Sequence, residues 1–255
     1  MSKAGRQRAD VALVACGLAE SRARAQALIR AGHAYGGDIR IEKPGQMVVC
    51  DGSLHLKGRD HPWVSRGGIK LDKALSHFAV MPEGAVVLDI GASTGGFTHV
   101  ALHHGAVRVF AVDVGHGQLA ETLRADARVT VLEGTNARHL TGDDIPVPVD
   151  LLVCDASFIS LKTLLPAGMA LVRPGGHMIA LIKPQFEVGR QRLGKGGVVR
   201  DPALHDTVCA DISGWLGAQP GWTVAGLTES PVTGPDGNRE FLIHAIKADA
   251  QATAR

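Results

Sequence analysis

Four ionisable residues that could act on a hydroxyl group stand beside predicted strands. Asp155 and Lys183 each follow directly after an apolar run, Glu240 starts the last predicted strand, and Lys70 precedes the first strand of the same sheet. Ligands of open α/β sheets bind beyond the carboxyl ends of the strands, so we expect these side chains to face one crevice. A lysine there could act as a base if its neutral form is favoured, or as a cation beside a developing alkoxide. These residue types are suited to proton transfer and to stabilising charge, and the sequence leaves both roles of Lys183 open.

A glycine-rich loop between a predicted strand and a predicted helix is the second chemical feature. The apolar run at 85–90 is typical of a buried parallel strand, and a helix is predicted from Phe97 to His104. Glycines between them let the backbone approach a ligand. Asp113 ends the next apolar run, 24 positions after Asp89, close to the spacing of an acid that binds ribose hydroxyls. The pattern predicts a nucleoside cofactor, held by Asp89, Gly91, Ala92, Ser93, Gly95, Gly96 and Phe97.

The glycine-containing segments also match three other motifs. Residues 91–95 fit the G-x-S-x-G turn of α/β-hydrolases, with Asp155 and later histidines available as partners, but this interpretation leaves Asp89 and Asp113 without a role. Residues 189–195 match a phosphate-binding loop only up to the position of its magnesium-binding serine or threonine. A dinucleotide-binding G-x-G-x-x-G pattern fails where the backbone must meet pyrophosphate. S-adenosylmethionine has no phosphate, and it is the cofactor that this loop fits best.

Composition limits the class of protein. With 255 residues, 45% of them hydrophobic, the chain can hold one large domain and a small one. Its apolar runs fall short of the ~20 residues of a membrane span, and its polar start lacks the hydrophobic segment of a signal peptide. We therefore expect a cytoplasmic protein without stable membrane association. The four cysteines lack C-x-x-C spacing, which favours small buried thiols over a zinc site or a disulfide framework. No metal and no oligomer is indicated.

Basic residues are concentrated near the start of the chain. Residues 1–75 carry a net charge of +6, and the remainder carries −4. Arg8 to Gly17 is predicted to form a short helix, and Ser21 is predicted to cap a second helix that ends at Gly32. Two short strands, at 39–41 and 46–49, are expected to form a small hairpin after these helices.

This order of elements resembles the RNA-binding domain named after ribosomal protein S-four. The resemblance lies in the string Ala19-Glu20-Ser21-Arg22-Ala23-Arg24-Ala25-Gln26-Ala27-Leu28-Ile29-Arg30-Ala31-Gly32 and in Lys43-Pro44 downstream. It covers about sixty residues and implies that the two helices dock on structured RNA, with arginines meeting phosphates. The RNA contacts expected in this domain are Arg6, Arg8, Arg22, Arg24 and Lys43.

The rest of the chain predicts a doubly wound α/β sheet. A helix expected from Leu71 to Phe78 precedes the first strand, and further apolar runs recur at the spacing of a βα repeat, at 107–112, 129–132, 149–154 and 177–182. Runs at 222–227 and 240–246, joined across the turn residues Pro235-Asp236-Gly237-Asn238, are expected to form a closing antiparallel pair. The predicted fold is a Rossmann-like, seven-stranded methyltransferase sheet. The predicted domains are 1–60 and 71–255, with a linker at 61–70.

In this sheet, Lys70, Asp155, Lys183 and Glu240 resemble the Lys-Asp-Lys-Glu tetrad of FtsJ-like RNA 2′-O-methyltransferases. With the small RNA-binding domain in front, the whole chain resembles the TlyA family of ribosomal RNA cytidine 2′-O-methyltransferases. The resemblance implies that S-adenosylmethionine is the cofactor and that ribosomal RNA or a ribosomal subunit is the partner. It assigns the 91–96 loop to the methionine end, Asp113 to the ribose and Asn136 to the adenine. Asp155 is expected to touch the cofactor as well. Further RNA contacts are expected from Arg66, Arg190, Arg192 and Lys195.

Two other classes of function remain open from the sequence. Some relatives of this family carry a haemolysin label, which would imply a membrane-active protein, although the sequence has no strongly amphipathic cationic helix of useful length. A non-catalytic RNA-binding or ribosome-assembly factor is the other alternative. The sequence does not show which nucleotide would be modified, nor whether naked RNA suffices.

Overall fold

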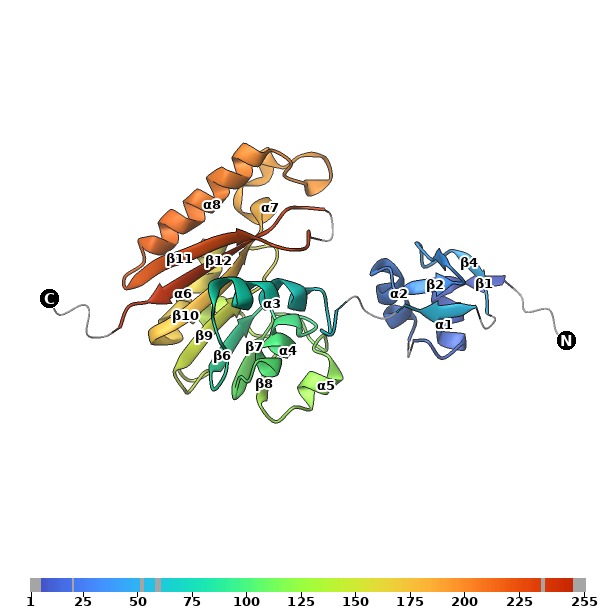
Figure 1. Cartoon of the computed structure of the whole chain (residues 1–255), viewed down its shortest axis with the longest axis horizontal. Helices are drawn as coiled ribbons and strands as arrows, with labels where there is room; N and C mark the ends of the chain where they lie inside the picture. The colour runs from blue at the N-terminus through green and yellow to red at the C-terminus, as the bar shows by residue number, and fades with distance from the viewer. Residues whose placement is uncertain (1–5, 20, 51–52, 58–60, 235–236, 250–255) are drawn as a thin grey trace. The chain divides into compact units, whose positions relative to one another are not determined.

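The computed structural model describes residues 6–19, 21–50, 53–57, 61–234 and 237–249. The side chains of Arg190 and Lys195 and the predicted turn residues Pro235 and Asp236 lie outside this description. Contacts divide the chain into two compact units, Met1–Pro62 and Trp63–Arg255 (Figure 1). The boundary between them falls directly before Trp63.

Two short helices form the centre of the first unit. These are α1 (Ala9–Ala15) and α2 (Arg22–Arg30), and their small apolar residues pack together in one cluster with Leu13 and Ile29. The Ser21 hydroxyl accepts a hydrogen bond from the backbone N–H of Arg24 at 3.2 Å, so the predicted N-cap of the second helix is confirmed.

The short strands of this unit pair differently from the prediction. The strands are β1 (Arg6–Arg8), β2 (Ala34–Gly36), β3 (Ile39–Arg40), β4 (Met47–Val49) and β5 (Leu54–Leu56). The expected hairpin between β3 and β4 is wrong, because β3 pairs with β2 and β4 pairs with β1. The hydrogen bond from the Ala9 N–H to the Gln46 carbonyl oxygen, at 2.8 Å, extends the pairing of β4 with the start of the chain. The sequence of such short strands does not indicate this pairing.

The cysteines of the first unit also correct the sequence analysis. Cys16 and Cys50, 34 positions apart, form a disulfide with their α-carbons 6.4 Å apart. The expectation that both would be separate thiols is therefore wrong for this pair, because the fold brings together two positions that are remote in sequence. Cys154 and Cys209 are free and buried, and burial raises the pKa of the Cys154 thiol to about 12.

A seven-stranded sheet forms the centre of the second unit, as predicted. The strand order is β11-β12-β10-β9-β6-β7-β8, and β12 runs antiparallel to both of its neighbours. The parallel strands are buried because helices cover both faces of the sheet. The predicted antiparallel pair at the end of the chain is confirmed. The strands are β6 (Val86–Ile90), β7 (Arg108–Val112), β8 (Val129–Leu132), β9 (Val149–Cys154), β10 (Val172–Ile182), β11 (Trp222–Glu229) and β12 (Phe241–Lys247).

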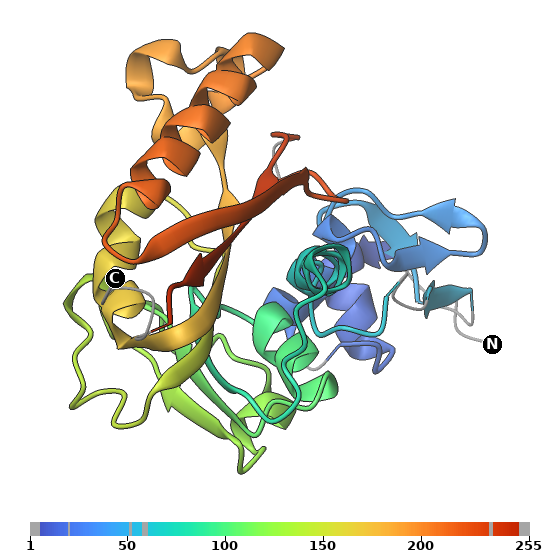
Figure 2. The same ribbon diagram turned by 60° about the vertical axis from the view of Figure 1, so that its left-hand side comes forward.

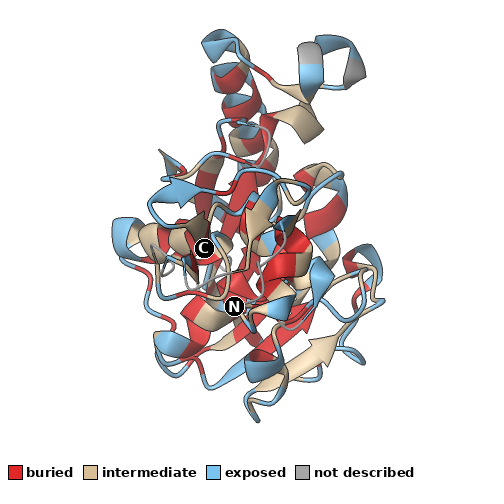
Figure 3. Cartoon of the chain, turned by 90° about the vertical axis from the view of Figure 1, so that its right-hand side faces the viewer, coloured by how far each residue is buried: buried red, intermediate tan, exposed pale blue. Residues whose placement is uncertain are grey.

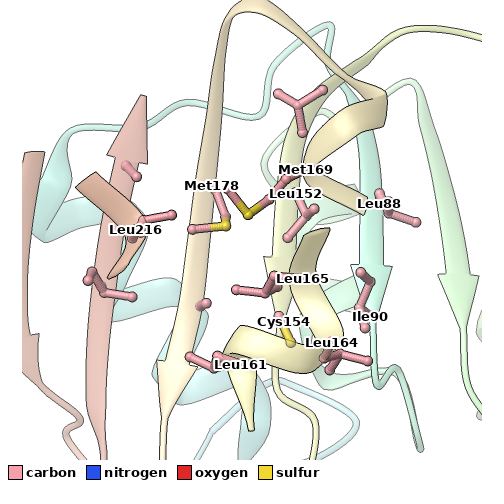
Figure 4. Close-up of a cluster of buried hydrophobic side chains, with 14 of the residues drawn as sticks. Leu88, Ile90, Leu152, Cys154, Leu161, Leu164, Leu165, Met169, Met178 and Leu216 are labelled. Atoms are coloured by element: carbon pink, nitrogen blue, oxygen red, sulfur yellow. The ribbon is translucent and has the colours of Figure 1, made fainter. Parts of the chain in front are cut away.

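Helices cover the two faces of this sheet in separate layers (Figure 2). On one face, Val87 of β6 packs in a cluster with residues of α3 (Gly67–Phe78), α4 (Gly96–His103) and α5 (Glu121–Arg124). On the other face, Leu88 packs with residues of α6 (Leu161–Leu171) and α8 (Pro202–Gly217) (Figure 4). Successive strand residues point to opposite faces, so one apolar strand supplies both clusters. Buried residues concentrate in these layers (Figure 3).

The start of α3 differs from the prediction and matters for the site. The helix begins at Gly67 rather than Leu71, so Lys70 belongs to its first turn and not to a linker. Two glycines there disfavour a helix by propensity alone. Gly68 lies directly against the Trp63 ring, where any side chain would collide, and packing against this buried tryptophan therefore overrides the propensity.

The remaining helical segments are short. They are η1 (Ala137–His139), α7 (Pro184–Glu187), η2 (Arg190–Arg192) and η3 (Lys195–Gly197). Within the described ranges, no helix is long and apolar enough to cross a membrane.

Candidate active site

The four predicted tetrad residues come together in the second unit. Lys70 Nζ lies 2.7 Å from Glu240 Oε2 and 3.4 Å from Asp155 Oδ2. Lys183 Nζ lies 2.7 Å from the other Asp155 oxygen, Oδ1. Asp155 therefore stands between two ammonium groups. Four separate segments supply these side chains: the first turn of α3, the residue directly after β9, the residue directly after β10, and the residue directly before β12.

The side chains of the tetrad are largely buried, so each charge needs an opposite charge nearby to offset its lost hydration. The side chains of Lys70 and Lys183 are each 9% exposed, and that of Glu240 is 1% exposed. Two cations and two anions give a formal charge of zero, so each buried charge has an opposite partner. Lys183 also donates to Ser157 Oγ at 2.8 Å and to the Asp155 carbonyl oxygen at 3.3 Å. The ion pair with Asp155 Oδ1 adds to these two hydrogen bonds.

A cavity of about 450 Å³ opens onto the tetrad, within the usual size range of ligand sites. We call it the catalytic cavity. Its walls combine the four charged side chains with the glycine loop and with three phenylalanines, Phe97, Phe158 and Phe186. Leu193 and Gly197, from the segment after β10, close another part of its wall.

A second cavity of about 710 Å³ adjoins the first, and we call it the cofactor cavity. It lies at the carboxyl ends of β6 and β7, as expected for a ligand site of this fold, and Asp113 and Asn136 line it. The two cavities share the lining residues Gly91, Ser93, Asp155, Ser157 and Phe158. A ligand in the cofactor cavity therefore meets the catalytic cavity beside Asp155.

The glycine loop follows the close path that its sequence predicts. Gly91 has φ +81°, and a side chain there would lie 2.9 Å from the Ala156 α-carbon. Ser93 has φ +46°, a left-handed conformation that is unusual for a residue with a side chain. Asp113 stabilises this turn, because its carboxylate accepts the Ser93 N–H and the Gly115 N–H, each at 2.8 Å.

Most of the predicted cofactor residues line one of the two cavities, but Asp89 and Gly95 do not. Asp89 is fully buried beneath the loop and accepts the Thr98 hydroxyl at 2.6 Å. Burial raises the pKa of this carboxyl to about 7. Gly95 instead has φ +91° and packs against leucine side chains. Asn136 lines the cofactor cavity, but its side chain also accepts the Arg138 N–H at 3.2 Å and so caps η1.

Phe158 is a site residue that the sequence analysis missed. It lines both cavities, is 90% exposed and has φ +67°. Its ring lies 5.0 Å from that of Phe186, centroid to centroid. An exposed aromatic ring on a strained backbone is costly for stability, and such strain is concentrated at functional sites. Phe158 stands three residues after Asp155, close to the carboxyl end of β9, and this position in the sequence could have predicted that it belongs to the site.

The predicted basic residues of the first unit surround a buried acid. Asp10, whose side chain is inaccessible, accepts hydrogen bonds from Arg8 at 3.0 Å, Arg22 at 3.1 Å and Gln26 at 2.9 Å. The Arg8 hydrogen bond is the main reason that the pKa of Asp10 lies below its usual range. Beside this network lies a cavity of about 650 Å³, which we call the basic cavity, lined by Arg8, Gln26, Arg30, Lys43, Pro44, Gly45 and Gln46.

The other predicted RNA contacts lie in different surroundings. Arg6 is exposed on β1, and Arg24 is half-buried on α2. Arg66 donates to the carbonyl oxygen of Thr233 at 2.6 Å, and Arg192 is exposed in η2. Arg190 and Lys195 have side chains outside the described part of the chain.

The geometry also bears on the other motifs. The Ser93 hydroxyl donates to Gln118 Oε1 at 3.0 Å, whereas a hydrolase nucleophile needs a histidine in that place. The segment that resembled a phosphate-binding loop forms η2 and η3 rather than a loop opening onto a long helix. Among the described residues, no group of three or more His, Cys, Asp or Glu side chains is placed to hold a metal ion.

Comparison with known proteins identifies the family of the chain. Residues 63–247 match the family model of FtsJ-like methyltransferases. The chain is 46% identical to the 16S/23S rRNA (cytidine-2′-O)-methyltransferase TlyA of Mycobacterium tuberculosis, over 94% of this chain and 90% of that protein. It is 47% identical to the rRNA methyltransferase homologue YqxC of Bacillus subtilis, over 94% of this chain and 85% of that protein.

A solved structure shows the same arrangement over nearly the whole chain. It is described as a hemolysin from Streptococcus thermophilus, is 41% identical, has a TM-score of 0.76, and the match covers 97% of this chain and 90% of that one. The match to the family model and the two relatives together settle the classification. The chain belongs to the FtsJ-like methyltransferase family and, within it, to the TlyA group.

Proposed function

We propose that this protein transfers a methyl group from S-adenosylmethionine to the ribose 2′-hydroxyl of cytidine in ribosomal RNA. The observation that carries the proposal is the position of the tetrad. Lys183 and Lys70 are each paired with acids at 2.7 Å in a cavity that shares Asp155 with the adjoining cofactor cavity. The similarity to the Mycobacterium tuberculosis enzyme supports cytidine in ribosomal RNA as the acceptor.

The residues of the cofactor cavity fit a nucleoside with a charged amino-acid tail. The Asp113 carboxylate would accept the ribose hydroxyls, and Asn136 would lie toward the base. Gly91 and Ser93 would let the methionine end approach the backbone, since Gly91 leaves no room for a side chain. When bound, S-adenosylmethionine supplies a methyl group that its sulfonium charge has already activated.

The tetrad would act on the acceptor hydroxyl. Lys183 Nζ lies among three oxygen atoms, Asp155 Oδ1, the Asp155 carbonyl oxygen and Ser157 Oγ, and this ion pair and these two hydrogen bonds support the cationic role. As a cation it would orient the 2′-hydroxyl and stabilise negative charge developing on its oxygen. Asp155 would hold the ammonium groups of Lys183 and Lys70 in position, and Glu240 would also hold that of Lys70. General acid–base assistance contributes ~100- to 10,000-fold, so positioning must supply much of the remaining acceleration.

RNA would be held by surfaces of both units. The basic cavity and the exposed arginines of the first unit would contact phosphates, which position an RNA without reading its sequence. In the second unit, the exposed Phe158 ring offers a face on which an unstacked base could stack at the mouth of the catalytic cavity. Arg192 and the neighbouring basic residues would contact the RNA backbone. The reaction would take place in the cytoplasm.

Transfer of tritiated methyl groups to total ribosomal RNA tests the proposal directly. We expect label in RNA purified from cells that lack the protein, and mapping of the modified nucleotides would place them at cytidine 2′-oxygens. RNA binding without transfer would instead indicate a non-catalytic assembly factor. Leakage from liposomes at micromolar protein would support the membrane-active alternative.

A further inference from the structure

A buried asparagine joins the wall of the catalytic cavity to the segment that carries Glu240, directly before β12. Asn238 is 2% exposed and stands two positions before Glu240. Its Oδ1 accepts the buried Val199 N–H at 2.9 Å, and its Nδ2 donates to the carbonyl oxygen of Gly197 at 3.2 Å. Turning the amide over would set donor against donor and acceptor against acceptor, so these partners fix its orientation. The side chain therefore holds two backbone groups of one segment.

The segment that Asn238 holds forms part of the substrate side of the site. Gly197 lines the catalytic cavity together with Leu193, and neither lines the cofactor cavity. Val199 is also held from the other side, because its carbonyl oxygen lies 2.9 Å from Nε2 of the buried His205. Gly194, Gly196 and Gly197 give this segment little conformational restraint of its own. Side chains from other elements must therefore fix its position.

The segment that carries Asn238 also packs on the tetrad. The Asn238 carbonyl oxygen accepts the Gly234 N–H at 2.9 Å. A side chain at Gly234 would lie 2.7 Å from Glu240 Oε1, so this backbone rests directly against the carboxylate. Asn238 consequently couples two walls of one cavity, the 193–199 segment and the residues around Glu240.

We propose that Asn238 is a positioning residue for the RNA substrate. It fixes residues 197–199 as a wall of the catalytic cavity and thereby sets the fit of the acceptor nucleotide, without touching the cofactor. This role rests on the proposed methyl transfer to RNA. It assigns a purpose to a buried polar side chain outside the tetrad, and burial of such a group is costly unless its hydrogen bonds are made.

Two variants and one control test the proposal. Asn238→Ala removes both hydrogen bonds, whereas Asn238→Asp keeps the acceptor for Val199 N–H and loses the donor to Gly197. Ser230→Ala is the matched control, because Ser230 is a buried polar residue of the same connection whose hydroxyl donates to Val232 at 2.7 Å rather than to the 197–199 segment. Each protein is tested as the full chain for S-adenosylmethionine affinity, for kinetics on ribosomal RNA, and for amide hydrogen exchange of residues 193–199.

Loss of a buried hydrogen bond should raise the exchange rate of the Val199 amide by about tenfold in Asn238→Ala. We expect KM for RNA to rise by a similar factor in Asn238→Ala and also in Asn238→Asp, whose second carboxylate oxygen would face the Gly197 carbonyl oxygen, with no change in cofactor affinity or in the control. An unchanged exchange rate would refute the claim that Asn238 holds residues 197–199 in place. Faster exchange with unchanged KM, or a parallel loss of cofactor binding, would refute the positioning role. Because exchange needs no substrate, failure of the wild-type protein to methylate RNA would overturn the proposed function separately.

Discussion

Replacing Lys183 by alanine should separate chemistry from cofactor binding. Lys183 lines the catalytic cavity and not the cofactor cavity, so the variant should bind S-adenosylmethionine with affinity within about threefold of wild type. Methyl transfer should fall by ~100- to 1,000-fold, which is the usual cost of removing one group that stabilises developing negative charge on oxygen. In free energy this is about 3–4 kcal/mol of transition-state stabilisation.

The same substitution should also destabilise the fold. It leaves Asp155 with only Lys70, at 3.4 Å, and changes the formal charge of the buried tetrad from zero to −1. Removal of one partner of a buried ion pair costs about 3–5 kcal/mol, so thermal unfolding must be measured beside activity. Lys183→Arg is the informative companion, because arginine keeps the charge and cannot act as a base. Partial activity in that variant would support the cationic role.

Calorimetry and a single-turnover transfer assay on one preparation provide the measurements. Calorimetry counts the molecules with an intact cofactor cavity, and activity is then expressed per binding site. Near wild-type transfer by Lys183→Ala per binding site would remove Lys183 from the mechanism. Loss of cofactor binding in step with activity would refute the division of the site into two cavities.

Four further changes test other parts of the molecule. Asp113→Ala should weaken S-adenosylmethionine binding by roughly 1–3 kcal/mol, measured by calorimetry, because it removes the acceptor for the ribose hydroxyls and for the Ser93 N–H; unchanged affinity would mean that the cofactor site is misplaced. Phe158→Ala should raise KM for RNA by the equivalent of about 1–3 kcal/mol of lost stacking, with unchanged thermal stability; an unchanged KM would exclude stacking on this ring. Lys43→Ala should lower the slope of log RNA affinity against log salt by roughly one unit if it meets a phosphate, and an unchanged slope would exclude that contact. Burial lowers the pKa of His244 to about 4 in the folded chain. Between pH 6.5 and 4 this side chain is therefore mostly protonated in the unfolded chain and mostly neutral in the folded chain. Unfolding free energy should therefore fall by about 2 kcal/mol from pH 7 to 5, and by less in His244→Gln; an equal fall in both would assign the effect to other groups, such as His177 beside it at 3.0 Å.

The strands and the tetrad could be predicted because local signals carry them. Each strand of the large sheet is a run of aliphatic residues, and Asp155 and Lys183 stand directly after two such runs. Parallel topology then places the ends of neighbouring strands at one edge, so chain position alone implies proximity. Lys70 was assigned to the tetrad through the resemblance, while its place in a helix depended on a tertiary contact between Gly68 and Trp63.

The parts that the sequence did not reveal depend on contacts between distant residues. The strand partners in the first unit and the Cys16–Cys50 bond join positions whose spacing carries no local pattern. Phe158 is exposed and has a positive φ, a conformation that few phenylalanines adopt. No neighbouring residue type in the sequence indicates this conformation. Asp10 lies in the first turn of α1 and is the buried partner of Arg8 and Arg22, a role that its place in the sequence does not indicate.

The Asp10 network changes how RNA binding by the first unit should be tested. Arg22 is an expected phosphate contact and also donates to the fully buried Asp10 carboxylate. The same is true of Arg8. Truncating either arginine would leave part of the Asp10 charge unpaired, so a loss of RNA affinity would mix a broken phosphate contact with a disturbed fold. Arg24 and Lys43 have no hydrogen bond to Asp10 among the described contacts, and substitutions there report on phosphates alone. Asp10 holds two guanidinium groups in fixed positions while each arginine side chain stays at least half exposed, and this arrangement would preorganise both arginines for the proposed phosphate contacts.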